Sequence, residues 1–198
     1  MNYQKELEKK LEYFKINNIK PKLLLHACCA PCSSYCLEYL NDYFDITVLF
    51  YNPNISSIEE FTKRENELKR FVKETGLDVN VAVIEYDSQE FYDEIKGLED
   101  CIEGGERCFV CYKLRQKKAC LYAKENGFDY FTTTLSISPH KNANKLNEIG
   151  AMLEKEYDMP YLYSDFKKNN GFKRSIELSK QYNLYRQDYC GCVFSKNK

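Results

Sequence analysis

The sequence predicts an α/β domain in which a parallel β-sheet lies between helices on both of its faces, a three-layer arrangement. Apolar runs at residues 23–25, 45–51 and 79–86 have the length and composition of buried strands. Amphipathic segments separate these runs, so the chain begins in the order β-α-β-α-β. Because neighbouring parallel strands need crossover connections, helices are expected on both faces. The length of 198 residues suits one domain, residues 1–198, with a core of its own.

The first half of the chain supports this order element by element. Leu7, Leu11 and Phe14 recur at helical spacing, which predicts an amphipathic helix over residues 3–17 that packs on the core. Pro31 suits the first turn of the next helix, where its missing N–H is not needed. The further elements expected up to residue 86 are strands at 23–25, 45–51 and 79–86 and helices at 33–40 and from Ser56 or Ser57 to Gly76.

The second half contains more loops. Gly104 and Gly105 interrupt the chain before a long helical pattern that Gly127 ends, and a polar loop at 136–142 follows the fourth strand. The expected elements are helices at 89–98, 108–126, 144–156 and 172–181, and strands at 130–135 and 161–163. The strands expected at 23–25, 45–51 and 130–135 are each followed by a polar or cysteine-containing loop. The carboxyl ends of parallel strands lie at one edge of a sheet, so we expect these loops to meet there.

Composition narrows the class of protein. The balance of 29 basic and 30 acidic residues argues against a globally basic nucleic-acid-binding surface, so any RNA contact is expected from a local patch. No apolar run approaches the roughly 20 residues of a membrane span, and the first ten residues lack an apolar signal core. We therefore expect a soluble, cytoplasmic protein without a membrane partner. Ten cysteines in a reducing compartment point to metal or redox chemistry rather than to a disulfide framework.

The cysteines fall into three close groups and a remainder. The groups are Cys28, Cys29 and Cys32 in the first strand-to-helix loop, Cys108 and Cys111 at a helix start, and Cys190 and Cys192 in the tail. Backbone N–H groups at helix starts favour anions, which suits thiolate ligands or nucleophiles. Any one pair is as well explained by buried thiols that pack as small hydrophobes, but three groups in loops or at helix starts make that explanation insufficient. Cys36 and Cys120 fit apolar helical positions, and the isolated Cys101 is not expected to be a ligand.

The spacing of the cysteines bears on the kind of site. Zinc is the main alternative to consider for a metal held by these cysteines, because cysteine-rich intracellular sites often hold structural zinc. Adjacent cysteines and a tight Cys-Gly-Cys are less typical of structural zinc pairs. The Cys190-Gly191-Cys192 segment suits a strained, reversible disulfide, so this pair is interpreted as redox-active rather than as metal-ligating.

Five motifs together resemble one known family. They are His26-Ala-Cys-Cys-Ala-Pro-Cys32, Tyr51-Asn-Pro-Asn54, Glu106-Arg-Cys-Phe-Val-Cys-Tyr112, Ser136-Ile-Ser-Pro-His-Lys141 and Asp188-Tyr-Cys-Gly-Cys192. In this order, over nearly the whole chain, they resemble the QueH family of epoxyqueuosine reductases. The resemblance implies reduction of the epoxide of epoxyqueuosine in tRNA to the alkene of queuosine, the last step of queuosine synthesis. It implies a [4Fe-4S] cluster on Cys28, Cys29, Cys108 and Cys111, with Cys190 and Cys192 as the redox pair.

The resemblance carries further expectations. It implies a fold like that of the PP-loop (HUP-like) proteins, but Cys28 to Ser33 stand where a glycine-rich phosphate loop would lie, so no use of ATP is expected. It also implies an additional iron, for which the candidate ligands are Cys32, Asp188, Cys190 and Cys192. An external electron donor is expected to restore the electrons.

The residues also suggest roles for other side chains. His26 and His140 are candidate proton donors. Burial in the core explains His26 better, whereas simple surface exposure explains His140 equally well. Basic residues that flank the expected site are candidates for phosphate contacts with tRNA: Lys141, Lys145, Lys167, Lys168, Lys173 and Arg174. Two other functions stay open, an ATP-dependent iron-sulfur tRNA thiolation enzyme of the PP-loop type and a non-catalytic, zinc-stabilised RNA-binding module.

Overall fold

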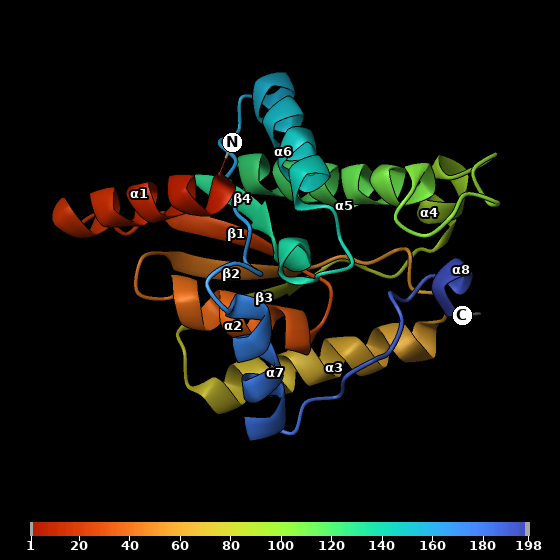
Figure 1. The fold of residues 1–198 in the computed structure, drawn as a ribbon, viewed down its shortest axis with the longest axis horizontal. Coiled ribbons are helices and arrows are strands. Elements are labelled where there is room, and N and C mark those ends of the chain that lie inside the picture. The colour runs from red at the N-terminus through yellow and green to blue at the C-terminus, as the bar shows by residue number, and fades with distance from the viewer. Residues whose placement is uncertain (1, 197–198) are drawn as a thin grey trace.

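A four-stranded parallel sheet forms the centre of the molecule (Figure 1). The computed structural model describes residues 2–196. The strands are β1 (Lys22–Ala27), β2 (Asp45–Phe50), β3 (Val79–Val83) and β4 (Tyr130–Thr133), in the spatial order β3-β2-β1-β4. In this register Leu25 of β1 lies between Val48 of β2 and Thr132 of β4. The sequence-based expectation of a parallel α/β sheet is confirmed.

Helices cover both faces of the sheet, as expected. They are α1 (Tyr3–Ile16), α2 (Ala30–Leu40), α3 (Ile58–Thr75), α4 (Gln89–Glu94), α5 (Glu106–Glu125), α6 (Ala143–Tyr157), α7 (Gly171–Gln181) and α8 (Val193–Lys196), with a 3-10 turn η1 at Thr134–Ile137. Figure 1 shows α5 and α6 on one side of the sheet and α2, α3 and α7 on the other. None of the helices among residues 2–196 is both long and apolar enough to cross a membrane.

The central strand β1 is buried on both faces, which explains its uninterrupted apolar run. Leu23 and Leu25 point into the core shared with α1, α2 and α3, whereas Leu24 points into the core under α5 and α6. All three side chains are fully buried. The strand that carries the first cysteine group is therefore held on every side by packed side chains.

Local sequence signals set the ends of the helices near the site. Pro31 lies in the first turn of α2, and Cys29 is the residue that precedes this helix, with extended backbone. Ser57 accepts a hydrogen bond from the Glu60 N–H at the start of α3, and Gly76 ends that helix with a left-handed φ of +66°. These starts bring α2 and α3 to the carboxyl edge of the sheet.

The structure corrects three expectations. The strand expected at 161–163 is wrong: Tyr161 makes only one parallel bridge, to Phe131. The segment leaves the sheet because the Ser164 N–H donates to the Asn147 side chain of α6 instead of to a strand. The strand expected at 130–135 stops at Thr133, whose hydroxyl accepts the Leu135 N–H and starts η1. The tail also contains the short helix α8, which its sequence did not predict.

Candidate functional site

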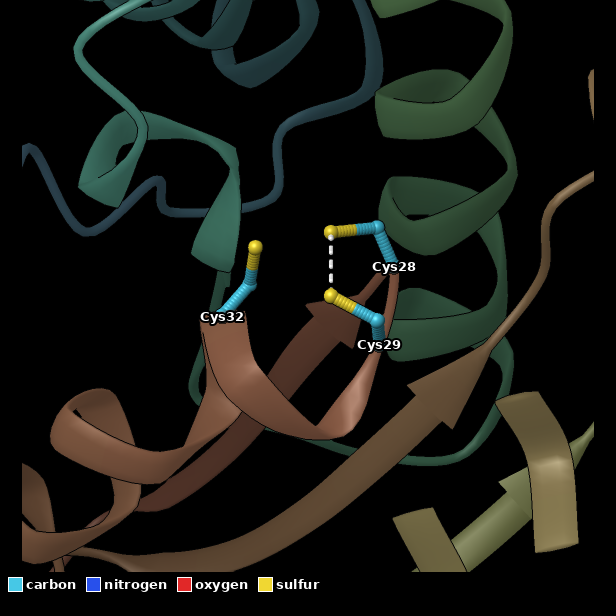
Figure 2. A group of neighbouring side chains, drawn as sticks. All are labelled: Cys28, Cys29 and Cys32. Carbon is cyan, nitrogen blue, oxygen red and sulfur yellow. Dashed lines mark hydrogen bonds between the residues drawn. The ribbon is translucent and has the colours of Figure 1, made fainter. Parts of the chain in front are cut away.

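Three thiols converge where β1 ends and α2 begins (Figure 2). The Sγ atoms of Cys28 and Cys29 lie 3.7 Å apart. All three sulfur atoms of Cys28, Cys29 and Cys32 lie within 4.8 Å of one another. Cys32 belongs to the first turn of α2 rather than to the loop in which the sequence placed it. The convergence follows from the abrupt turn between a buried strand and a helix that starts at Ala30.

The three thiols share hydrogen bonds that favour one negative charge among them. Hydrogen bonds from Cys29 and Cys32 hold the pKa of the Cys28 thiol well below its ordinary value, and the cations Arg115 and Lys141 lower it further against the effect of burial. The same hydrogen bonding to Cys28 raises the pKa of Cys29 and of Cys32. The shift favours the thiolate of Cys28, which is the form that binds metals.

The second cysteine group lies in the first turn and a half of α5. The Gly104 N–H donates to the Cys108 Sγ over 3.2 Å. Cys111 is 7% exposed and packs with Phe91, Ile95 and Cys192 in a small apolar cluster. Burial raises the pKa of Cys111 to about 11, although Arg115 opposes the effect. These two thiols are therefore protonated at neutral pH unless a metal replaces the proton.

The third group lies in the tail, and its two thiols face different surroundings. The Lys141 Nζ lies 3.1 Å from the Cys190 Sγ. Burial alone would raise the pKa of Cys190, but Lys141 and Arg115 outweigh it and lower that pKa below its ordinary value. The Cys192 thiol instead donates to the Ser195 hydroxyl over 3.4 Å. All ten cysteines are free thiols in the structure.

Two cations connect the three groups. The charge of Arg115 interacts with Cys28, Cys111 and Cys190, one thiol from each group. Lys141 likewise acts on the thiols of Cys28, Cys108, Cys111 and Cys190. Segments about 80 residues apart in the chain are thus gathered around the same positive charges, and anionic sulfur is favoured there.

A cavity of about 810 Å³ opens beside these thiols. Its walls come from the β1–α2 turn, η1 and the loop after it, α7 and the tail. The polar and charged residues that line it are Glu103, Arg115, Ser138, His140, Lys141, Ser175, Arg186, Gln187, Asp188, Tyr189, Ser195 and Lys196, with Cys28, Cys29, Cys32 and Cys190. The volume is that of a pocket for one nucleoside-sized ligand, and the polar walls suit a hydrogen-bonding ligand.

The structure places the predicted ligands unevenly. Cys28, Cys29 and Cys32 are close enough to share one metal ion, since their sulfur atoms all lie within 4.8 Å of one another. No other group of three or more metal-ligating side chains within residues 2–196 is as close. Cys108 and Cys111 lie outside that group, whereas Cys32, which the four-ligand set omits, lies inside it. Cys36 and Cys120 are fully buried in the two cores, as their helical positions predicted.

The two histidines differ clearly. His26 is fully buried, with its ring nitrogens 2.9 Å from the Thr133 Oγ1 and 3.0 Å from the Tyr51 carbonyl oxygen. Burial lowers the pKa of His26 to about 4, so its ring is neutral at physiological pH and joins β1 to its neighbours. His140 is exposed and lines the cavity. Of the two candidate proton donors, His140 is the one placed to meet a ligand.

Some of the six basic residues that are candidates for phosphate contacts with tRNA are paired with carboxylates. Three of the six form ion pairs: Lys145 with Glu148, Lys167 with Asp165, and Arg174 with Glu38 and Glu177. Lys141 points at the Cys190 thiol. A charge that is already paired contributes less to phosphate binding, so the six residues do not form one uniform surface.

Sequence reasoning missed the arginines that support the site. Arg115 follows Cys111 by one helical turn and therefore shares its face of α5, a spacing visible in the sequence. Arg64 of α3 donates to the Cys190 carbonyl oxygen over 3.1 Å, across 126 residues. Nothing local in the sequence indicates that second contact.

The donor set fits a thiolate-bound metal cofactor. Soft sulfur ligands select iron-sulfur clusters, zinc or copper(I) rather than hard cations. Cys28 from one segment and Cys111 from another come under the same two cations, Arg115 and Lys141, and Cys108 comes under Lys141. Buried positive charge beside thiols suits a cofactor that is itself negatively charged.

This chain is similar in sequence, over nearly its whole length, to known proteins of one family. The family model described as epoxyqueuosine reductase QueH matches residues 23–198. The epoxyqueuosine reductase QueH of Streptococcus pyogenes serotype M1 is 43% identical over 199 residues, covering 98% of this chain and 78% of that protein. The QueH protein of Staphylococcus epidermidis is 43% identical, covering 100% and 86% of the two chains, and that of Thermotoga maritima is 34% identical, covering 87% and 89%.

One solved structure shares the fold at low sequence identity. The U34-tRNA thiolase NcsA from Methanococcus maripaludis, solved with its [4Fe-4S] cluster, matches with a TM-score of 0.56 and 15% identity. The match covers 96% of this chain and 67% of that one. This likeness concerns the fold alone, and it agrees with the parallel α/β architecture expected from the sequence.

Proposed function

The chain belongs to the QueH family of epoxyqueuosine reductases, and on that basis we propose that it reduces the epoxide of epoxyqueuosine in tRNA to the alkene of queuosine. The observation that carries the proposal for this chain is the gathering of thiols from three distant segments around two cations, beside a cavity of about 810 Å³. The thiolation enzyme and the zinc-stabilised RNA-binding module are not favoured, because the matching relatives are named as epoxyqueuosine reductases.

The proposed cofactor is a [4Fe-4S] cluster on Cys28, Cys29, Cys108 and Cys111. When bound, such a cluster supplies electrons one at a time. The support comes from this chain's own thiols: an adjacent pair at the β1–α2 turn and a pair one turn apart on α5. An additional iron remains part of the proposal, and Cys32, Asp188 and Cys190, which line the cavity, are its candidate ligands together with Cys192.

The reaction consumes two electrons and two protons and releases the epoxide oxygen as water. The Cys190/Cys192 pair supplies both electrons when it is oxidised to a disulfide. Because Lys141 favours the thiolate of Cys190, the pair brings one proton, from the Cys192 thiol, and His140 supplies the second. In the structure the two thiols are free and face different groups, Lys141 and Ser195, so this step requires the tail to bring them together. An external reductant then restores the dithiol.

Residues around the cavity perform the remaining tasks in this proposal. His140 is placed on the cavity wall, where it can donate a proton to the oxygen that leaves. Lys141 holds negative charge on the Cys190 sulfur. Leu135, Ile137 and Phe172 form an apolar part of the wall that limits the access of water.

The test is anaerobic purification followed by iron, sulfide and zinc analysis, together with incubation with epoxyqueuosine-containing tRNA and a chemical reductant. We expect iron and sulfide in the protein and queuosine among the nucleosides of the digested tRNA. Cys120→Ala is a matched control, because Cys120 is fully buried between α5 and α6 and does not line the cavity. Stoichiometric zinc without iron, or tRNA that returns unchanged, would reject the proposal.

A further inference from the structure

Arg115 is a buried cation that has no carboxylate partner among the residues that the structure describes. It lies on α5 and is 1% exposed. One of its terminal nitrogens donates to the Asn52 Oδ1 over 3.2 Å. Its Nε and its other terminal nitrogen have no hydrogen-bond partner among residues 2–196, and none of the ion pairs formed by those residues includes Arg115.

Arg64 is a second buried guanidinium near the site, and it has a carboxylate partner. It is equally buried, with 1% of its side chain exposed, but its Nε lies 2.6 Å from a Glu60 carboxylate oxygen. It also donates to the Cys190 carbonyl oxygen over 3.1 Å. Burying a charge is costly unless an opposite charge and hydrogen bonds compensate it, and Arg64 receives both.

Thiols from all three cysteine groups lie near Arg115, together with Tyr112, Tyr51 and Lys141. The charge of Arg115 interacts with Cys28, Cys111 and Cys190, which come from the three cysteine groups. A protonated thiol is neutral and accepts hydrogen bonds weakly, so these thiols compensate the guanidinium fully only when they carry negative charge.

We propose that Arg115 is the counter-ion of the metal cofactor: its charge and its free N–H donors stabilise the anionic cofactor and favour its reduced form. This inference rests on the proposed function, since it takes the thiols as cofactor ligands. The reduced form of a cluster carries one more negative charge than the oxidised form, and a neighbouring cation in a medium of low dielectric constant stabilises that form more. Charge and hydrogen bonds near the sulfurs are established determinants of cluster potentials. Arg115 is thus a positioning and tuning residue.

The test compares Arg115→Gln, which removes the charge, with Arg115→Lys, which keeps it, and with Arg64→Gln as the matched buried arginine. The midpoint potential of the cofactor is measured by an anaerobic redox titration followed by electron paramagnetic resonance. We expect Arg115→Gln to shift this potential to more negative values and Arg115→Lys to recover most of the shift. If Arg115→Gln loses iron while Arg115→Lys retains it, the need for the charge is equally supported.

A second measurement uses the metal-free protein and separates this role from a structural one. Without the cofactor, two N–H groups of Arg115 lack a partner and no ion pair holds it among residues 2–196, so Arg115→Gln is expected to lower the melting temperature of the apoprotein less than Arg64→Gln does. Arg64→Gln leaves Glu60 without its partner, and the melting temperature is expected to fall by about 6–12 °C.

The outcomes are distinct. An apoprotein melting temperature that falls as far in Arg115→Gln as in Arg64→Gln, or a midpoint potential that Arg115→Gln leaves unchanged, overturns the role of Arg115. A parent protein that contains no iron after anaerobic purification overturns the proposed cofactor and this inference together, and it does so before any Arg115 variant is compared.

Discussion

The first and last cysteine groups are held in opposite ways. Cys28 and Cys29 follow β1, a strand buried on both faces and paired with β2 and β4. Cys190 and Cys192 lie in a tail without a strand, between α7 and the short α8. Figure 1 shows this tail running past α3 toward α8. The first group takes its geometry from the main core of the fold, and the last group takes its geometry from a few hydrogen bonds and from the small apolar cluster around Cys192.

Three contacts hold the tail at Cys190-Gly191. Arg64 donates to the Cys190 carbonyl oxygen over 3.1 Å, and the Ser56 N–H donates to the Gly191 carbonyl oxygen over 3.0 Å. Lys141 contacts the Cys190 sulfur. Segments with few buried contacts open at a lower free energy than core strands do. This difference suits different roles for the two groups. Cys28 and Cys29, the core group, would hold a cofactor, and Cys190 and Cys192, the tail group, would move during a catalytic cycle.

The largest effect is expected at the core group. Cys28→Ser replaces a proposed thiolate ligand by a poor one at the centre of the gathered sulfurs, so we expect loss of most of the proposed iron and a fall in turnover of more than about 100-fold. Iron content and the cluster absorbance measure the first effect, and queuosine formation measures the second. Cys36→Ala serves as the control, since Cys36 is fully buried in the core under α2. Full iron content in Cys28→Ser would remove that residue from the ligand set.

The tail group is expected to behave differently. Cys190→Ser removes one half of the proposed redox pair without touching the cluster ligands, so turnover should stop while the cluster absorbance remains. The informative quantity is the ratio of iron to protein in Cys190→Ser against that in Cys28→Ser. If both variants lose iron equally, the contrast between the two groups fails and Cys190 is a ligand.

A smaller effect is expected when the tail is displaced without changing a thiol. Gly191 has a φ of +118°, and a Cβ there would lie 3.1 Å from both the Arg64 guanidinium and the Ile55 Cγ1. Gly191→Ala therefore introduces backbone strain of about 1–3 kcal/mol and pushes against the Arg64 contact. We expect kcat to fall about tenfold with the iron content unchanged.

The matched control for Gly191→Ala is another glycine with positive φ. Gly127 has a φ of +68° and open space around the position of a Cβ. Gly127→Ala should lower the free energy of unfolding by about 1 kcal/mol and leave kcat unaltered. Equal kcat losses in both variants would mean that stability, and not the placement of the tail, limits turnover.

The parts of the fold that the sequence predicted are those with local signals. The apolar run before Cys28, the helix start at Pro31 and the helix end at Gly76 each depend on neighbouring residues, and each lies where expected. The strand expected at 161–163 failed because its pairing is decided by Asn147, which takes the Ser164 backbone groups away from the sheet. Periodicity carries no information about that competition.

The same distinction applies to the site. Cysteine spacing indicated which thiols form groups, and it placed Cys28, Cys29 and Cys32 together. It did not indicate the cations, because the contact of Arg64 with Cys190 joins residues 126 positions apart. The surroundings of Arg115 likewise depend on how three segments meet. Long-range electrostatic support becomes visible only in the folded chain.

The smallest effect is expected from a change at Glu67, which holds the chain just after α7 ends. The Tyr185 N–H donates to a Glu67 carboxylate oxygen over 2.7 Å, and Arg70 pairs with the same carboxylate. The hydrogen bond from Arg70 lowers the pKa of Glu67 below its usual 4.5, so its contribution to stability is present at neutral pH and is lost as the pH falls through the lowered value. Glu67→Gln should lower the free energy of unfolding by about 0.5–1.5 kcal/mol.

Glu67→Gln tests the contrast between the core and tail cysteine groups, because Glu67 holds the start of the tail and touches no cysteine. Urea unfolding measures the loss of stability, and limited proteolysis measures opening of the tail in the native protein. We expect cleavage between residues 185 and 196 to accelerate in Glu67→Gln while iron content and cluster absorbance remain those of the parent. Release of iron in step with cleavage would show that the tail and the core group open as one unit, and the division between a fixed and a movable cysteine group would then be wrong.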